Sequence, residues 1–402
     1  MQGSIEAAGH LGALGDRFAW HDACRLACYS PQVNLSDLDA TDDPALREII
    51  AERIRTAGPV TFAEFVELAL YHPTRGYYFT QDPVRDYQSS PNVHPVFGAA
   101  IARQLVAFWQ AMDRPAHFTA FEAGAGGGRL AADVLRALHR EAPDLYDAIR
   151  YVVQDVVLGR GDALQRLERA GLPEAKVEVA SELPRNASIE GCILSNELLD
   201  ALPFHRVRRR DGVLYELRVG LEDGRFVDVE AMPLPVIERH FAELGVSPGE
   251  GCEAEVILAA PAWTRRAASA VRRGYLLTLD YGYEAEQLYA PWRKRGTLLT
   301  FYRHTSGDDP YTRIGRQDIT ASVDFTSVLR AGEAAGLTTL GLVTQAEYLA
   351  SLGVGEALAA GPSGSEIEAY YALRRAVIEL TDTSGLGRIR VMIQGRGVPG
   401  TT

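Results

Sequence analysis

The sequence predicts an α/β fold built on a parallel sheet, and three observations lead to it. Apolar, strand-like runs alternate with segments of helical period between residues 97 and 196. A glycine-rich turn, FEAGAGGGRL, joins the first such run to the helix after it. The chain of 402 residues, 47% of them hydrophobic, is long enough for a large core with additional segments. Strands separated by helices favour a doubly wound, Rossmann-like sheet, which binds its ligand at the carboxyl ends of the strands.

Helices are expected on either side of the first strand. Residues 1–45 show no sustained period and are expected to form an N-terminal extension. Thr61 and Glu64 have the T-x-x-E spacing of a capping box, so a helix should begin there and end near Tyr71. The other helical periods lie at residues 45–57, 97–112, 128–140, 161–171 and 259–273.

Strands are expected wherever an apolar run is bounded by turn residues. These runs are HFTAFEAG (117–124), RYVVQD (150–155), KVEVA (176–180), GCILSN (191–196), YLLTLDYG (275–282), GTLLTFYRH (296–304), TTLGLVT (338–344) and IRVMIQG (389–395). Residues 205–232 break this rhythm, because VLYELRV and RFVDVEA flank the turn residues EDG and predict an antiparallel hairpin. The hairpin is therefore expected to be an insertion in the α/β core.

Composition and charge exclude several classes of protein. A formal net charge of −12 opposes nucleic-acid binding, because affinity for phosphate backbones comes from many Lys and Arg contacts. No apolar run approaches a membrane span, so no membrane partner is expected. The cysteines, Cys24, Cys28, Cys192 and Cys252, are too few for a disulfide framework and lack the partners of a metal site. The first residues have neither a basic nor an apolar leader pattern, so a cytoplasmic location is expected.

The stretch FEAGAGGGRL combines an acidic residue with closely spaced glycines. Its pattern is Glu122-x-Gly124-x-Gly126-x-Gly128, and such glycines allow positive φ angles and close approach of a bound nucleoside. A dinucleotide fingerprint would need glycine where Arg129 stands, so an NAD-dependent oxidoreductase is disfavoured. A tight turn without a ligand is the structural alternative. The pattern is typical of Rossmann-like enzymes that bind S-adenosyl-L-methionine (SAM), the predicted cofactor, and Glu122 would organise the loop or the methionine ammonium group.

Two further strand ends supply polar residues. Such an enzyme needs an acidic residue after its second strand to bind the ribose hydroxyls, and Asp155 is predicted for this role, with Gln154 as the alternative. The fourth strand ends in SNELLDALPF, where Asn196, Glu197 and Asp200 can orient an amine or guanidine and accept its proton. The same residues suit a helix N-terminus, and both readings can hold together.

The order of motifs resembles that of the MidA-type family of SAM-dependent methyltransferases. The resemblance rests on GPVTFAEFVELALYHPTRGYYF, DYQSSPNVHPVFG, FEAGAGGGRL, SNELLDALPF, LDYG, RGTLLTFYRH and DITASVDFT, and it runs from about Gly58 to the terminal IRVMIQGRG. It implies a class I methyltransferase core with a helical N-terminal cover. Mitochondrial members of the family are protein arginine methyltransferases that act on a subunit of respiratory complex I during its assembly, whereas bacterial members mostly have no assigned substrate.

The resemblance also implies roles for individual residues. The cover over the SAM pocket would be formed by Gly76, Tyr77, Asp86, Ser90 and Pro91. The acceptor side would be formed by Asn196, Glu197 and Asp200. The opposite wall would be formed by Asp280, Tyr281, His304, Asp318, Thr320 and Asp324. Asn196 would also contact the cofactor. A structural role is the alternative for each of them. The sequence departs from the family pattern at Arg85-Asp86-Tyr87, where the family has Gly-Asp-Phe, and at Pro91-Asn92, where it has Pro-Glu. The carboxylate missing at Asn92 would be one partner of a guanidinium group, so the acceptor is not simply carried over.

The predicted reaction is an in-line displacement in which a nitrogen nucleophile, held by Glu197 or Asp200, attacks the methyl group of SAM without a metal ion. The resemblance implies a protein arginine as acceptor. A small molecule or peptide, methylated on nitrogen or oxygen, and a methyltransferase-like assembly factor without turnover are the alternatives, and a homodimer is left open. The expected division of the chain is an N-terminal extension (1–45), a helical cover (46–115), the first part of the core (116–204), an inserted antiparallel substrate-side region (205–250) and the remainder of the core with C-terminal strands (251–402).

Overall fold

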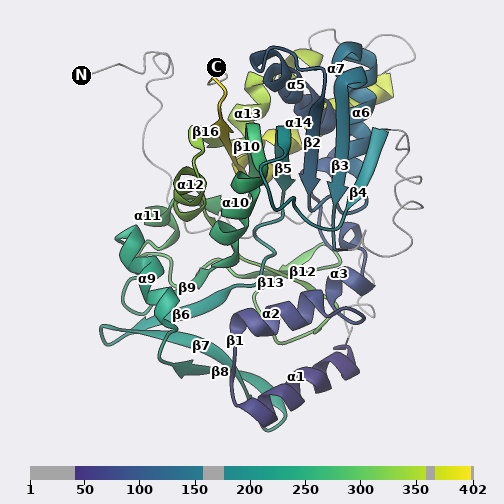
Figure 1. Ribbon diagram of the computed structural model, residues 1–402. Helices are drawn as coiled ribbons and strands as arrows, with labels where there is room; N and C mark the ends of the chain where they lie inside the picture. Colours follow the sequence, from purple (N-terminus) through teal and green to yellow (C-terminus); the bar gives the residue numbers. More distant parts are fainter. Residues whose placement is uncertain (1–40, 157–175, 359–366, 400–402) are drawn as a thin grey trace. The chain divides into compact units, whose positions relative to one another are not determined.

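The apolar runs of the sequence assemble into one large sheet (Figure 1). The structure is a computed structural model that describes residues 41–156, 176–358 and 367–399. The strands of this sheet are β2 (Phe118–Ala123), β3 (Ile149–Gln154), β4 (Val177–Ala180), β5 (Ile189–Asn196), β10 (Val271–Asp280), β16 (Thr338–Thr344) and β17 (Arg390–Arg396). Among the described residues they lie in the order β16-β17-β10-β5-β2-β3-β4. The Rossmann-like α/β architecture is therefore confirmed.

One strand contradicts the prediction of a wholly parallel sheet. β17 pairs antiparallel with both β10 and β16, whereas β10, β5, β2, β3 and β4 pair in parallel. The described part of the connection from β16 to β17 contains α13 (Gln345–Ser351), η4 (Val354–Leu358), α14 (Ile367–Thr381) and η6 (Leu386–Arg388). This connection returns to the end of the sheet that the chain left, because Thr344 at the end of β16 pairs with Arg390 at the start of β17. β17 must therefore run back along β16.

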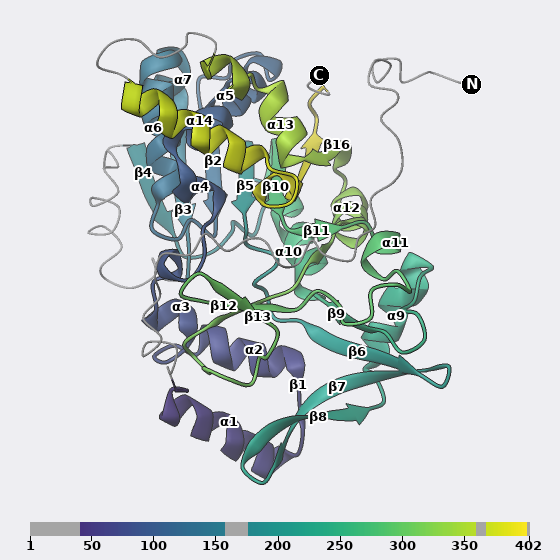
Figure 2. The same cartoon turned by 180° about the vertical axis from the view of Figure 1, so that it is seen from behind.

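Helices cover both faces of the large sheet. α5 (Pro95–Ala111), α6 (Arg129–Glu141), α7 (Pro143–Ala148), α13 and α14 lie on one face, which Figure 2 shows from the front. α10 (Ala259–Ala270) and α12 (Phe325–Ala334) lie on the other. Neighbouring residues of β2 point to opposite faces, because Ala120 belongs to the apolar cluster of Phe97 and Val134, while Phe121 belongs to that of Ala267. The α/β core is thus apolar on both sides, as a buried sheet requires.

Local hydrogen bonds support two of the predicted helix starts. Asp43 caps α1 (Pro44–Ala57), and the Thr61 hydroxyl accepts from the Glu64 backbone N–H at 3.1 Å at the start of α2 (Phe62–Tyr71). The helix predicted over 259–273 is wrong at its end: α10 stops at Ala270, because Val271 already pairs with Ile189 of β5. The helix predicted at 161–171 and most of the extension at 1–45 lie outside the described residues.

The predicted hairpin is confirmed as part of a second sheet. β7 (Val213–Glu222) and β8 (Arg225–Ala231) pair antiparallel, and β7 also pairs with β1 (Val60–Thr61) and β6 (His205–Arg210). β9 (Glu253–Val256) pairs with β6, so this sheet extends past residue 250, where the prediction ended the inserted region. α9 (Pro235–Leu244) follows β8. Residues of α1, α2 and β7 share one apolar cluster, so the two helices pack on this sheet.

Short elements connect the two sheets. They are α3 (Tyr77–Thr80), η2 (Pro83–Arg85), α4 (Ser90–Val93), β11 (Gly282–Tyr283), α11 (Ala285–Leu288), β12 (Leu299–Tyr302), β13 (Thr305–Gly307), β14 (Asp318–Thr320) and β15 (Val323–Asp324). In Figure 1 the arrowheads of β2 and β3 point toward α3 and the second sheet. None of the described helices is long and apolar enough to cross a membrane. The division of the chain into the predicted domains stays a prediction.

Candidate active site

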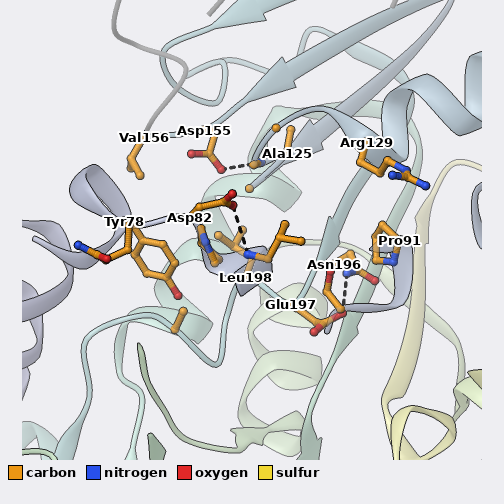
Figure 3. A pocket seen from close by; sticks show the side chains of 18 of the residues that line it. Tyr78, Asp82, Pro91, Ala125, Arg129, Asp155, Val156, Asn196, Glu197 and Leu198 are labelled. Atoms are coloured by element: carbon orange, nitrogen blue, oxygen red, sulfur yellow. Dashed lines mark hydrogen bonds between the residues drawn. The ribbon is translucent and has the colours of Figure 1, made fainter. Parts of the chain in front are cut away.

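A cavity of about 1190 Å³ lies at the carboxyl ends of the core strands (Figure 3). Its core half is formed by residues that follow β2, β3 and β4, and these are Gly124–Gly127, Arg129, Leu130, Asp155, Val156 and Ser181–Leu183, with Glu122 and Gln154 from the strands themselves. Its cover half is formed by Tyr71, Tyr78–Tyr87, Tyr302, Arg303 and Arg316. Asn196 and Glu197, which end β5, line the same cavity. Two reactants can therefore meet in one space.

The glycine loop has the backbone that the sequence predicts. Gly124 and Gly126 have φ angles of 73° and 52°, in the left-handed region that favours glycine. A Cβ atom on Gly124 would come within 2.9 Å of the Leu198 side chain, whereas a Cβ on Gly126 would meet no protein atom within 4 Å. The Gly126 N–H donates to Asp155 Oδ2 at 2.9 Å. The loop is thus closed against the protein at Gly124 and open to the cavity at Gly126.

Glu122 and Gln154 support this loop from the strands. Glu122 is buried, and its Oε2 accepts from the Tyr151 hydroxyl at 2.7 Å. Burial raises the pKa of Glu122 from 4.5 to about 8. The Gln154 carbonyl accepts from the Gly124 and Ala125 backbone N–H groups at 2.8 and 3.1 Å. Gln154 therefore acts on the loop through its backbone, and Glu122 offers a carboxyl group to a cationic ligand.

The structure adds residues that the sequence analysis did not select. Ser181, Glu182 and Leu183 follow β4 and line the core half. The rule that ligands bind at the carboxyl ends of parallel strands would have found them directly after KVEVA. Trp263 of α10 also lines the cavity, and it packs in one cluster with Leu183. No sequence signal marks this pair, because 80 positions of chain separate Trp263 from Leu183.

Glu197 has a constrained position in the cavity. Its φ of 51° is uncommon for a residue other than glycine, and such backbone strain is often found at functional sites. Its Oε1 accepts from the Ser90 N–H and from Asn196 Nδ2, both at 3.0 Å. Burial raises the pKa of Glu197 from 4.5 to about 7. Figure 3 shows Asn196 and Glu197 together near Pro91. Glu197 thus joins the strand end to the cover.

Asp200 and Asp280 are buried behind this wall and do not line the cavity. Asp280 Oδ2 accepts from the backbone N–H groups of Leu198 and Leu199 at 3.1 and 2.7 Å, and its Oδ1 accepts from the Tyr281 N–H at 2.9 Å. Burial raises the pKa of Asp280 from 3.8 to about 7, and burial beside Asp280 raises that of Asp200 well above its ordinary value. Asp280 therefore fixes the turn after Glu197.

Some of the predicted cover residues line the cavity, and others lie behind its wall. Pro91 lines the cavity, whereas Ser90 lies behind it, and the Ser90 hydroxyl donates to Gln345 Oε1 at 3.0 Å. Gly76 packs against the backbone, since a Cβ atom on Gly76 would come within 2.5 Å of the His72 backbone nitrogen. The Tyr77 hydroxyl donates to Asp86 Oδ2 at 2.8 Å. These contacts hold the cover in place, while Asp86 itself lines the cavity.

The structure does not bring the predicted opposite wall into the cavity. Tyr281 and His304 are not lining residues, and Asp318 is buried behind Tyr78, whose hydroxyl donates to its Oδ1 at 3.0 Å. Thr320 of β14 pairs with Leu299 of β12. Gly128, although predicted for the cofactor, is the N-cap residue before α6 and lies outside the cavity lining. Asp324 caps α12, where its Oδ1 accepts from the Thr326 N–H at 3.0 Å. Asp318 and Asp324 thus use their Oδ1 atoms in hydrogen bonds within the protein.

The chemistry of the cavity fits SAM. Space is open beside Gly126 and Gly127, and the buried Asn196 Oδ1 has no hydrogen-bond partner among the described residues. Carboxyl groups at Glu122, Asp155 and Glu197 suit an ammonium group, ribose hydroxyls and a positive sulfonium. Within the described residues no group of three or more His, Cys, Asp or Glu side chains could hold a metal ion.

Comparisons with known proteins agree with this geometry. A family model described as "Putative S-adenosyl-L-methionine-dependent methyltransferase" matches residues 100–343. The chain is 28% identical to the protein arginine methyltransferase NDUFAF7 homolog of Drosophila melanogaster, over 73% of this chain and 71% of that protein. It is 27% identical to NDUFAF7 of Xenopus tropicalis, over 82% and 80%. A Burkholderia thailandensis "likely methyl transferase" bound to S-adenosyl-homocysteine superposes with a TM-score of 0.80 at 30% identity, over 92% of this chain and 96% of that one.

These relatives correct one prediction. Both NDUFAF7 proteins are named as mitochondrial, which contradicts the predicted cytoplasmic location. That prediction was a default for a chain whose first residues show no leader pattern. Relatives aligned over most of the chain carry more weight than such a default, so the prediction is withdrawn.

Proposed function

The chain belongs to this family of SAM-dependent methyltransferases, and from this premise we propose that it methylates a guanidine nitrogen, namely an arginine side chain of a protein. The fold, the methyltransferase activity and the use of SAM follow from the family match and the related structure. The observation that carries the choice of acceptor is Glu197. Its half-buried carboxyl group stands on a strained backbone and lines the same cavity as the core half and the cover half.

The core half would hold the cofactor. The open backbone at Gly126 and Gly127 would pass beneath the methionine and ribose, and Asp155 would bind the ribose hydroxyls. Leu183 and Trp263 supply the apolar surfaces that an adenine ring needs. Bound SAM supplies an electrophilic methyl group on a positively charged sulfur.

Glu197 would hold and deprotonate the acceptor. A carboxylate pairs with the N–H groups of a guanidinium more strongly than with a neutral donor. A pKa of about 7 lets the group accept a proton near neutral pH. Tyr71 and Tyr78 line the cover half, and aromatic rings favour cations. The proton released during transfer would therefore move to Glu197.

Asn92 supports a second class of methyl acceptor as the alternative. The related family has Glu at this position, whereas here the Asn92 amide lines the cavity and its Nδ2 donates to Ser89 Oγ at 2.9 Å. The cavity thus offers one carboxylate fewer to a guanidinium. This favours a small molecule or peptide as the alternative acceptor, methylated on nitrogen or oxygen.

The test begins with calorimetry of SAM binding to the purified protein. We expect binding below millimolar SAM, and no binding would contradict the proposal. The purified protein is then incubated with a protein lysate and with SAM that carries a labelled methyl group. The lysate is hydrolysed and analysed for methylarginine. Label on arginine supports the proposal, label on a small molecule supports the alternative, and binding without transfer indicates an assembly factor without turnover.

A further inference from the structure

A buried chain of hydrogen bonds leads from the cavity wall to the C-terminal elements of the fold. The Ser90 N–H donates to Glu197 Oε1, and the Ser90 hydroxyl donates to Gln345 Oε1, both at 3.0 Å. Gln345 Nε2 in turn donates to the Leu380 carbonyl near the end of α14, also at 3.0 Å. Ser90, Gln345 and Leu380 are each 0% exposed. Water therefore does not compete for the bonds behind the wall.

The donors and acceptors of this chain can run in only one direction. A backbone carbonyl can only accept, so the Gln345 amide must turn Nε2 toward Leu380 and Oε1 toward Ser90. The Ser90 hydroxyl must then donate to that oxygen. Gln345 is itself fixed as the first residue of α13, since its own N–H donates to the Ile389 carbonyl at 2.7 Å. The amide therefore offers Ser90 an acceptor in one fixed place.

Ser90 needs this support because it begins a very short helix. α4 has four residues and packs against α5, α6 and α14 (Figure 2). The first N–H groups of a helix have no partner within it, so the Ser90 N–H is free to donate to a carboxylate. A helix of this length is too short to be stable by its own hydrogen bonds. The bond between the Ser90 hydroxyl and Gln345 therefore fixes where the Ser90 N–H points.

The two carboxylate oxygens of Glu197 are used differently. Oε1 accepts both from the Ser90 N–H and from Asn196 Nδ2. Oε2 accepts no hydrogen bond from any residue that the structure describes. Because each carboxylate oxygen has about two acceptor sites, Oε1 is fully used, while Oε2 remains available to a ligand in the cavity that Glu197 lines. The two donors thus orient the carboxyl group.

We propose that Gln345 is a positioning residue for methyl transfer: by holding Ser90 it locks Glu197 Oε1 and presents Oε2 to the nitrogen that receives the methyl group. The proposal rests on the proposed function, in which Glu197 accepts the proton of the acceptor. Gln345 itself does not line the cavity, so it touches neither reactant. It acts through Ser90, and a misplaced proton acceptor slows transfer without weakening cofactor binding.

The test compares Gln345→Met with a matched control, Gln394→Met. Gln394 is also 0% exposed, but its Nε2 donates to the Leu329 carbonyl and to Thr339 Oγ1, both at 3.0 Å and both outside the cavity lining. Both variants should lower Tm, because each leaves a buried carbonyl without its donor. Only Gln345→Met should slow the transfer of label from saturating SAM to lysate acceptors, by at least about 10-fold. The Kd of S-adenosyl-homocysteine in calorimetry should stay within about threefold in both.

Two further variants test the proposal even if Gln345→Met is unstable. Gln345→Glu can keep both bonds, because a buried carboxyl group is protonated and can donate to Leu380 while it accepts from Ser90. It should therefore retain at least about half of the wild-type rate. Ser90→Ala removes only the hydroxyl and should slow transfer as much as Gln345→Met, and the double variant should be no slower than either.

Three results would overturn the positioning role and leave the proposed function standing. They are a rate for Gln345→Met equal to that of Gln394→Met, no rescue by Gln345→Glu, and rate losses that multiply in the double variant. The wild type tests the proposed function separately. Label on a small molecule would contradict the arginine acceptor while the variants are still compared on that molecule. Binding of SAM without label on any acceptor would contradict both proposals.

Discussion

Glu197 combines two costs that a structural residue would avoid. Its left-handed backbone is strained, and the partial removal of its carboxyl group from water raises its pKa to about 7, against the lowering effect of the hydrogen bonds that it accepts. Ser90 and Asn196 each donate one hydrogen bond to its Oε1, so the side chain is oriented before any ligand binds. A half-buried and oriented carboxyl group at a cavity wall is what a general base requires.

We predict that methyl transfer depends on the ionisation of Glu197. Only the carboxylate can accept the proton, so kcat/KM should rise as pH increases through about 7 and level off above it. Glu197→Gln should lower kcat at least about 100-fold with SAM affinity nearly unchanged. The control is Glu182→Gln, an exposed glutamate that lines the same cavity. A pH profile that persists in Glu197→Gln would assign the ionisation to another group.

Gly126 allows a similar test of the cofactor half. Its Cβ would enter open cavity space, so Gly126→Ala should weaken SAM binding at least about 10-fold. The positive φ adds a stability cost of about 1 kcal/mol. Gly212→Ala is the matched control, because Gly212 has φ 77°, also faces open space and lies in a hairpin of the second sheet. Calorimetry should show normal SAM affinity for this control. Equal weakening in both variants would mean that strain alone lowers affinity.

At the scale of elements, local sequence patterns predict most helices and strands of the core. They fail where contacts with segments far along the chain set the direction or the end of an element. β2 and α6 follow from an apolar run, a glycine turn and a helical period. The direction of β17 does not, because it depends on where a long connection returns. The predicted end of α10 was wrong for the same reason. Pairing with β5 starts β10 at Val271, earlier than the helical period of the sequence suggests. Pairing between distant segments overrides local propensity in both cases.

The turn after β5 depends on an element far along the chain. Asp280 at the end of β10 accepts three backbone hydrogen bonds and thereby holds the turn that follows Glu197. We predict that Asp280→Ala lowers the free energy of unfolding by about 3 kcal/mol, because buried N–H groups lose their partner, and also lowers methyl transfer. Asp324→Ala, which removes the cap of α12, should cost about 1 kcal/mol and leave transfer unchanged. Denaturant unfolding and initial rates check both. Normal transfer by Asp280→Ala would show that the turn does not position Glu197.

At the scale of the molecule, the strand ends of the site were predictable and its cover half was not. Glu122 lies near the end of β2, while Gly126, Asp155 and Glu197 follow strands in the sequence, and all four line one cavity. Tyr71, Tyr302, Arg316 and Trp263 reach the cavity through tertiary packing, which no spacing encodes. Several residues named by family resemblance lie one layer behind instead. The Ser90 hydroxyl, for example, binds Gln345, which is 255 positions away.

The whole fold contains buried carboxyl groups whose ionisation opposes folding. Burial raises the pKa of Glu197 and Asp318 to about 7 and that of Glu122 to about 8, from ordinary values of 4.5, 3.8 and 4.5. A raised pKa in the folded state contributes stability that is fully present below the unfolded pKa and is lost as pH rises through the folded pKa. His240 has the opposite sign, because burial lowers its pKa to about 4, but this affects stability only below about pH 6.5.

We therefore predict that the protein without SAM loses stability between about pH 6.5 and 8.5, by an amount on the order of a few kcal/mol. Asp318→Asn should reduce this slope, because the amide cannot ionise. Glu178→Gln is the control, since Glu178 is exposed and paired with Arg150, which lowers its pKa, so the slope should persist. Saturating SAM should also reduce the slope, because its positive charge favours the carboxylates. Denaturant unfolding across this range measures all four slopes, and a stability that is constant or rises toward the alkaline end would show that these carboxyl groups are already ionised in the folded protein.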